Sequence, residues 1–156
     1  MSPQQRFRID WVLVDELAIG PAPRAERHLP RLAAAGVRAV LSLCSEQEAP
    51  PPPGLSDCFL FARLVLPDHR AGRLPEPAEL NAALALLAQL HQEHGAVFVH
   101  CVGAMERSPL VCLAWLVQRH RLTNEQALDY LMQVHPGSNP LPGQLALIKL
   151  LRSNIG

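Results

Sequence analysis

The chain has 156 residues, no formal net charge at pH 7 and 49% hydrophobic residues. This length and composition predict one domain with a full hydrophobic core and exclude a globally disordered chain. The balanced charge, without any basic block, gives no support for binding to nucleic acids or to a membrane surface.

The N-terminal apolar run is broken by acidic residues before it reaches signal-peptide length, and no stretch approaches the roughly 20 apolar residues of a transmembrane helix. We therefore expect a protein of the cytoplasm, where cysteines stay reduced. We also expect it to be a monomer. No two cysteines form a CxxC pair, so a zinc site is not expected. The basic residues are nearly all Arg, a usage typical of GC-rich bacterial genomes.

Strands and helices are predicted to alternate along the chain. Short apolar runs are typical of strands, and apolar residues three or four apart are typical of amphipathic helices. In chain order, these patterns predict strands at 11–14 and 17–19, a helix at 24–35, strands at 38–43 and 58–66, a helix at 78–94, a strand at 96–100, and helices at 108–120, 125–134 and 144–152. The alternation favours a single α/β domain over residues 1–156, with a mostly parallel central sheet flanked by helices.

Turn and capping residues mark several boundaries of these elements. Gly36 follows the first predicted helix and would end it, and Pro30 inside that helix is expected to kink or break it. Thr123 and Gln126 have the spacing of a capping box at a helix start. The proline-rich stretch 45–57 is predicted to be a loop.

The segment HCVGAMERSPL, residues 100–110, joins the last predicted strand to a helix. Parallel α/β sheets bind ligands at the carboxyl ends of their strands, and Cys101 lies at such an end. Pro109 suits the first turn of a helix, so the preceding N–H groups can surround a phosphate-like anion at the helix N-terminus. Arg107 can bind two oxygens of that anion. The residues expected to line this phosphate loop are Val102, Gly103, Ala104, Met105, Glu106 and Arg107.

Cys101 is therefore a candidate nucleophile. A helix N-terminus and an adjacent cation favour the thiolate, and a thiolate below a bound phosphate ester can attack phosphorus to form a covalent phosphoenzyme. Ser108 can hydrogen-bond the sulfur as nucleophile and later as leaving group. His100 is interpreted as a residue that orders the loop and not as a base. Cys101 taken alone would more often be a core thiol, the role expected of Cys112.

The spacing of His-Cys, five residues and Arg-Ser resembles the signature of the cysteine-dependent protein phosphatases, in particular the compact dual-specificity phosphatases. The segments LAIGPAP, GVRAVLSL and NPLPGQLALIKLL also resemble that family, so the resemblance covers most of the chain. It implies a protein-tyrosine-phosphatase-like fold and hydrolysis of phosphomonoesters through phosphocysteine, with no metal or cofactor. The implied partners are phosphorylated proteins or peptides, carrying phosphotyrosine or, as further candidates, phosphoserine and phosphothreonine.

The resemblance also implies a general acid on a separate loop, about thirty residues before the nucleophile. Asp68 matches this position, 33 residues before Cys101 and directly after a predicted strand. It would protonate the leaving oxygen and then deprotonate the attacking water. A plain turn residue is the alternative for Asp68. Asn139 is expected to fix loops through side-chain-to-backbone bonds, with the loop that bears Asp68 as one candidate.

Two residues depart from the family pattern. Ala104 stands where the family has Gly, so a left-handed backbone there would cost energy or the loop would shift. Glu106 puts a negative charge beside the anion site and would disfavour highly charged substrates, unless it turns outward or pairs with Arg107. The five residues before Arg107 contain no Lys or Arg. Because members of the resembled family that prefer inositol phosphates carry added positive charge in this loop, the resemblance disfavours that substrate class.

Other residues leave alternatives open. Cys44 ends a predicted strand and is a candidate redox partner that could form a reversible disulfide with Cys101, a passive buried thiol being the alternative. Arg70 and Arg73 follow the candidate acid and are interpreted as solvated loop charges, with contact to substrate as the alternative. Two rival functions remain. One is a phospho-binding module without catalysis, which both departures favour. The other is a different thiolate enzyme, a sulfurtransferase or an arsenate reductase.

Overall fold

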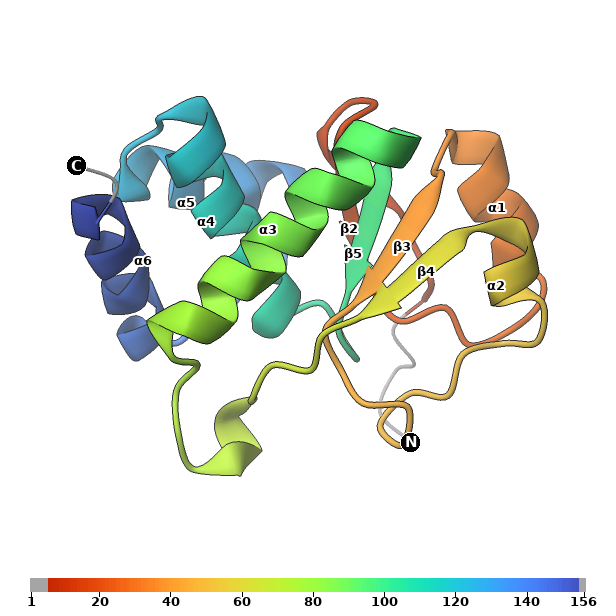
Figure 1. The fold of residues 1–156 in the computed structure, drawn as a ribbon, viewed down its shortest axis with the longest axis horizontal. Coiled ribbons are helices and arrows are strands. Elements are labelled where there is room, and N and C mark those ends of the chain that lie inside the picture. Colours follow the sequence, from red (N-terminus) through yellow and green to blue (C-terminus); the bar gives the residue numbers. More distant parts are fainter. Residues whose placement is uncertain (1–5, 155–156) are drawn as a thin grey trace.

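A five-stranded sheet runs through the centre of the molecule (Figure 1). The computed structural model describes residues 6–154. The strands are β1 (Asp10–Leu13), β2 (Leu17–Gly20), β3 (Ala39–Ser42), β4 (Leu60–Arg63) and β5 (Val97–His100), arranged in the order β1-β2-β5-β3-β4. β1 and β2 form an antiparallel hairpin, and all other neighbouring pairs are parallel. The predicted α/β fold with a mostly parallel sheet is therefore confirmed.

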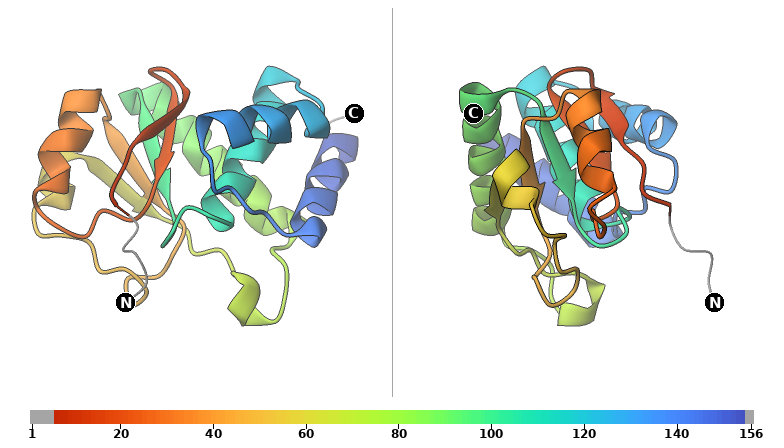
Figure 2. Two further views of the ribbon diagram at one scale, coloured as in Figure 1. Left: turned by 180° about the vertical axis from the view of Figure 1, so that it is seen from behind. Right: turned by 90° about the vertical axis from the view of Figure 1, so that its right-hand side faces the viewer.

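Helices cover both faces of the sheet. They are α1 (His28–Ala35), α2 (Leu55–Cys58), α3 (Pro77–His94), α4 (Arg107–His120), α5 (Asn124–Val134) and α6 (Pro142–Asn154), with a short 3₁₀ helix η1 (His69–Ala71). α1 and α2 pack on one face, and α3 to α6 lie on the other (Figures 1 and 2). None of the helices in residues 6–154 has the length and apolar character needed to cross a membrane.

Two apolar cores fill the space between the sheet and these helices. Successive side chains of a strand point to opposite faces, and β5 shows this clearly. Val97 and Val99 belong to the core shared with α3 to α6, whereas Phe98 belongs to the core shared with α1 and α2. α4 is the most enclosed helix, with every residue from Arg107 to Val117 buried. The start of α4 is therefore held rigidly beside the carboxyl end of β5.

Several predicted boundaries were wrong, each for a local reason. α1 begins at His28, so Pro30 lies in its first turn, where the missing N–H has no intrahelical acceptor, and the helix is not broken. β4 begins only at Leu60, because the predicted loop before it ends in the short helix α2. The capping box of Thr123 and Gln126 is confirmed, with both reciprocal hydrogen bonds present.

The carboxyl ends of β2, β5, β3 and β4 meet at one edge of the sheet, because these strands are parallel. The connections that leave this edge are residues 21–27, 43–54, 64–76 and 101–106. In Figure 1 they lie at the bottom of the molecule, where the turn carrying η1 projects away from the sheet. Every residue of the predicted site other than Arg107, Ser108, His100 and Asn139 lies on one of these connections.

Candidate active site

The phosphate loop between β5 and α4 is tied down through its carbonyl groups. Three of them accept hydrogen bonds from other segments: Val102 from the N–H of Ala22 at 3.1 Å, Met105 from the N–H of Asn139 at 2.6 Å, and Ala104 from Nε2 of His135 at 2.7 Å. In a planar trans peptide the following N–H points the opposite way. The N–H groups of Gly103, Met105 and Glu106 are thereby directed to the inner side of the loop. Such a ring of donors is suited to an anion.

Ala104 adopts the conformation that glycine would take without strain. Its φ is 59°, in the left-handed region, and its side chain is buried. Of the two outcomes predicted for this position, the structure therefore has the strained residue and not a shifted loop. Asn139 contacts the loop through its backbone N–H, and no side-chain hydrogen bond of Asn139 is found within residues 6–154.

Cys101 and Ser108 lie together below the loop. Cys101 Sγ is 3.2 Å from Ser108 Oγ, within hydrogen-bond distance, and both residues are buried. His100 donates from Nδ1 to the carbonyl of Cys101 at 2.9 Å. Burial, together with the charges of nearby arginines, lowers the pKa of His100 to about 4, against the opposing effect of that bond. The ring is therefore neutral at physiological pH.

Arg107 is anchored on one side by Glu48 and by main-chain oxygens. Nη1 donates to Glu48 Oε2 at 3.2 Å and to the carbonyls of Leu43 and Leu66 at 3.4 and 3.3 Å, and Nη2 donates to Glu48 Oε1 at 2.9 Å. The Arg107 side chain is 5% exposed. Within residues 6–154 no hydrogen bond of Arg107 Nε is found, which leaves that edge of the guanidinium for a bound anion.

Asp68 precedes η1 and faces Arg107, with Oδ2 3.8 Å from Nη2. Arg70 contacts it three times, through its N–H at 2.9 Å, Nε at 2.9 Å and Nη2 at 2.8 Å. Burial raises the pKa of Asp68, but the hydrogen bonds from Arg70 and the charge of Arg107 outweigh it and hold the pKa below its usual value. Asp68 is thus an ionised carboxylate in the ligand-free site.

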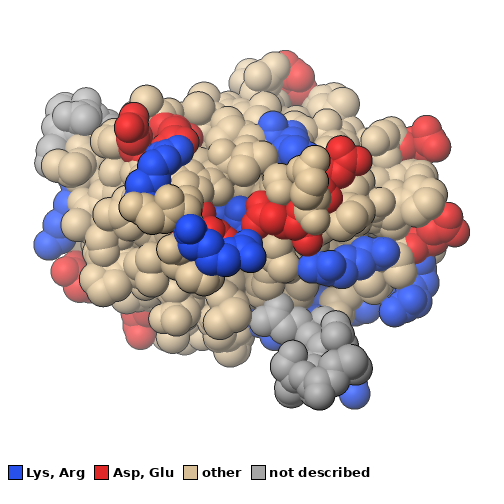
Figure 3. Space-filling model, turned by 90° about the horizontal axis from the view of Figure 1, so that it is seen from below, with Lys and Arg blue, Asp and Glu red and all other residues tan. Residues whose placement is uncertain are grey.

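Arg70 also donates from Nη2 to Glu48 Oε1 at 2.9 Å, so it joins the two carboxylates that surround Arg107. The side chain of Arg70 is 64% exposed, as expected of a solvated loop charge, but it also bonds both of these carboxylates. Arg73 instead forms a paired contact with Glu79 at 2.7 and 2.9 Å. In Figure 3, which views the face where the strands end, acidic and basic side chains lie next to one another in the middle of this face.

Glu106 does not pair with Arg107. Its Oε2 accepts from Nδ1 of His69 at 2.9 Å, and its Oε1 accepts from Nε2 of Gln144 at 3.0 Å. His69 lies directly after Asp68, so this hydrogen bond joins the loop of the candidate acid to the phosphate loop. The negative charge of Glu106 is thus shared with neighbours instead of facing Arg107.

These groups surround one open cavity of about 410 Å³. Its lining residues are Asp68, His69, Arg70, Cys101, Val102, Gly103, Met105, Glu106 and Arg107. The thiol and the guanidinium come from the segment that joins β5 to α4, the carboxylate comes from the connection 64–76, and all three meet here. Among residues 6–154 there is no group of three or more His, Cys, Asp or Glu side chains that could hold a metal ion.

Cys44 is a buried free thiol in the same core as Cys101. Its Sγ lies 3.5 Å from Ser42 Oγ. Burial raises the pKa of the Cys44 thiol, although the Ser42 hydrogen bond and the charge of Arg107 oppose this. Cys112 is fully buried in α4, as predicted for a core thiol.

Sequence patterns missed four residues that contact the site: Glu48, His69, Gln144 and His135. Glu48 had a usable signal. Ser45 and Glu48 are three apart, and they exchange hydrogen bonds of 2.8 and 3.2 Å directly after a strand end. Polar residues at that place in a parallel sheet are candidates for ligand contacts. For Gln144 and His135 no local signal exists, because their partners are distant in the chain.

Comparison with known proteins shows that this chain is similar to members of one protein family. The sequence model described as "Dual specificity phosphatase, catalytic domain" matches residues 22–153. Dual specificity protein phosphatase 2 of Mus musculus is 29% identical over 105 residues, which are 67% of this chain and 31% of that protein. Phosphatidylglycerophosphate phosphatase PTPMT2 of Arabidopsis thaliana is 24% identical over 146 residues, which are 94% of this chain and 64% of that protein. The chain thus spans less than two thirds of either relative.

The fold is also found among solved structures. The crystal structure of PTPMT1 in complex with PI(5)P has a TM-score of 0.81 and 20% sequence identity. The match covers 94% of this chain and 96% of that one. At this identity the likeness concerns the fold alone.

Proposed function

Because this chain belongs to the dual specificity phosphatase family, we propose that it hydrolyses phosphomonoesters with Cys101 as nucleophile and without a metal. One observation carries the proposal. Cys101, Arg107 and Asp68 line a single cavity, and they supply a sulfur nucleophile, a cationic fork and a proton-transfer carboxyl group.

In the first step the phosphate loop and Arg107 bind the phosphoryl oxygens, and Cys101 Sγ attacks phosphorus from below. The P–O bond to the leaving group breaks, and the leaving oxygen takes a proton from Asp68. Asp68 must therefore gain a proton when substrate binds. The approach of a phosphate dianion favours this, because a nearby like charge raises the pKa of a carboxyl group.

In the second step Asp68, now ionised, takes a proton from water, and the water oxygen attacks the phosphocysteine. The S–P bond breaks, and Cys101 leaves as a thiolate. Ser108 Oγ, 3.2 Å from the sulfur, stabilises that thiolate by a hydrogen bond. His100 stays neutral through both steps and keeps the end of β5 in place.

Phosphorylated proteins or peptides are the substrates we favour, with phosphotyrosine first. The open cavity has an exposed apolar side chain, Met105, on its rim and no Lys or Arg between Cys101 and Arg107. A phospholipid monoester is the second candidate. It is favoured by the likeness to a phosphatidylglycerophosphate phosphatase and to a protein crystallised with PI(5)P.

Two rival activities make different demands on the site. A phospho-binding module would bind anions without turnover. A sulfurtransferase would not need Asp68, and an arsenate reductase would need a second thiol such as Cys44 or Cys112.

Aryl phosphate hydrolysis should be measured from pH 4.5 to 8 with a chelator present and with reduced thiols. We expect no activity in Cys101→Ser.

The Asp68→Asn variant should lose about 100-fold or more in rate, together with the fall in activity at high pH. Turnover that survives Cys101→Ser would overturn the mechanism, and absence of turnover in the wild type would favour the binding module. The substrate class is then decided with a phosphotyrosine peptide and with vesicles containing phosphatidylinositol 5-phosphate or phosphatidylglycerophosphate. A much higher kcat/KM on vesicles would replace our first candidate with the second.

A further inference from the structure

A buried histidine outside the catalytic cavity connects the first strand to the phosphate loop. His135 follows α5 and is 1% exposed. Its Nδ1 lies 2.6 Å from Asp10 Oδ2, and its Nε2 lies 2.7 Å from the carbonyl oxygen of Ala104. The ring therefore bridges a carboxylate in β1 and the strained residue of the phosphate loop.

Both atoms that His135 faces at these short distances are hydrogen-bond acceptors. A neutral imidazole has one N–H and can donate to only one of them, so both bonds require the doubly protonated ring. Arg8 and Asp10 are the charged groups that contact the ring among residues 6–154. Arg8 Nη2 is 3.5 Å from Nδ1, while Arg8 Nε binds Asp10 at 2.8 Å. Asp10 is thus in contact with both Arg8 and the ring of His135.

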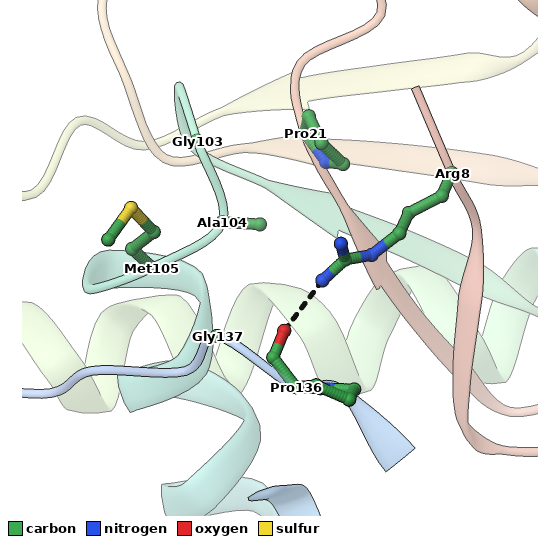
Figure 4. A pocket seen from close by; sticks show the side chains of 7 residues that line it. All are labelled: Arg8, Pro21, Gly103, Ala104, Met105, Pro136 and Gly137. Carbon is green, nitrogen blue, oxygen red and sulfur yellow. Dashed lines mark hydrogen bonds between the residues drawn. The ribbon is translucent and has the colours of Figure 1, made fainter. Parts of the chain in front are cut away.

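The backbone around the ring is fixed on both sides. The N–H of His135 donates to Leu131 at 2.8 Å, and its carbonyl accepts from Ser138 Oγ at 2.9 Å. Arg8 Nη2 donates to the carbonyl of Pro136 at 2.7 Å. Figure 4 shows Arg8, Pro136 and Ala104 around a small pocket that also borders Gly103 and Met105 of the phosphate loop. The ring is thus held on a rigid frame against the outer side of this loop.

We propose that His135 acts as an imidazolium positioning residue, which holds the carbonyl of Ala104 and so keeps this alanine in its left-handed conformation. When the ring loses its proton, only one of its two bonds can persist. The peptide between Ala104 and Met105 is then free to rotate, and its N–H turns away from the bound anion. The phosphate loop would therefore bind anions well only while His135 is charged. This inference rests on the proposed function only in requiring that the loop binds an anion.

A double-mutant cycle with a non-hydrolysed anion tests the inference without need of turnover. Tungstate, a dianion across the range used, is titrated by calorimetry from pH 5.5 to 8.5. We expect His135→Ala to weaken tungstate binding about tenfold, because a buried hydrogen bond from a charged donor is lost. In the Ala104→Gly background the same change should weaken tungstate binding by less than about threefold, because glycine adopts positive φ without the hydrogen bond from His135.

Two further variants complete the design. His120→Ala is the matched control, since His120 also contacts a carboxylate, Glu16 at 2.7 Å, but at the far end of α4, and it should leave binding unchanged. If His135→Ala does not fold, Asp10→Asn replaces it. Removal of that carboxylate should move the pH at which tungstate affinity falls to a lower value.

Nitrogen-resolved NMR reports the ring directly and should show two N–H protons on His135 at pH 6. A single N–H at pH 6 overturns the inference, and so does an equal loss of affinity in the wild-type and Ala104→Gly backgrounds. A wild type that binds tungstate with the predicted coupling but hydrolyses nothing would overturn the proposed function alone.

Discussion

Glu48 is the residue whose removal should disturb the site most without touching its reacting groups. The change Glu48→Gln keeps the shape of the side chain and removes its charge. Arg107 then loses the carboxylate that binds both of its terminal nitrogens, and the NH₂ of the new amide cannot accept from either. The main-chain acceptors of Leu43 and Leu66 remain, so the guanidinium keeps one anchored nitrogen.

The size of the effect follows from burial. Loss of one partner from a fully buried ion pair costs about 3–5 kcal/mol. Here Arg107 is 5% exposed but Glu48 is 22% exposed, and two carbonyl acceptors stay in place. We therefore expect a loss of about 1–3 kcal/mol in the free energy of unfolding. For a chain of this size that lowers Tm by about 2–10 °C.

The pH dependence of this loss has a definite sign. The hydrogen bond from Arg107 is the largest of the effects that together hold the pKa of Glu48 below its usual value. A carboxyl group with a lowered pKa stabilises the fold above its unfolded pKa, about 4.3, and this contribution disappears as the pH falls through the lower folded pKa. The difference in Tm between wild type and Glu48→Gln should therefore be full at pH 6 to 8 and shrink below about pH 4.

Thermal unfolding and aryl phosphate kinetics check the two consequences. Glu46→Gln is the control, because it removes the same charge from an exposed side chain in the same loop. We expect KM to rise for Glu48→Gln, because the guanidinium of Arg107 is no longer held in the orientation that binds phosphate together with the phosphate loop. A Tm equal to that of Glu46→Gln would refute the stability argument. A lower KM would mean that Glu48 competes with substrate for Arg107 instead of orienting it.

Two more predictions concern the acid and the nearby thiol. Arg70→Gln should move the fall of kcat at high pH to a higher pH, because the side-chain hydrogen bonds that lower the pKa of Asp68 are lost. Arg73→Gln is the control and should leave the pH profile unchanged. Identical pH profiles for wild type and Arg70→Gln would contradict this prediction. Treatment with peroxide should oxidise Cys101 to a sulfenic acid, which the thiol of Cys44 attacks with release of water. Mass spectrometry of digested protein should then show a Cys44–Cys101 peptide that reducing agent removes, and its absence would exclude the protective disulfide.

The sequence was most informative where the chemistry is local. Cys101, Arg107 and Ser108 are close in the chain, and the strand, loop and helix that carry them are set by nearby apolar residues and Pro109. Asp68 could be located only through the family resemblance, since nothing in its own surroundings separates an acid from a turn residue. The apolar spacing predicts a helix from residue 24 with Pro30 inside it, but α1 begins at His28, because a proline fits the first turn of a helix.

The residues that sequence reasoning missed are those whose partners lie far away in the chain. Glu48 reaches Arg107 across 59 positions, and His135 reaches Asp10 across 125. The spacing from Ser45 marks Glu48 as a candidate, but no periodicity or spacing rule can tell which distant residue it contacts, because these pairs exist only once the sheet has brought its strand ends together. Ala104 shows the consequence. From the sequence alone, alanine at this position is unfavourable, because a side chain disfavours the left-handed backbone conformation that the phosphate loop requires there. In the folded chain the carbonyl of Ala104 is bonded to the buried ring of His135, so the strained alanine and the distant histidine act together. Only a double-mutant cycle that changes both residues can measure how strongly each one affects anion binding.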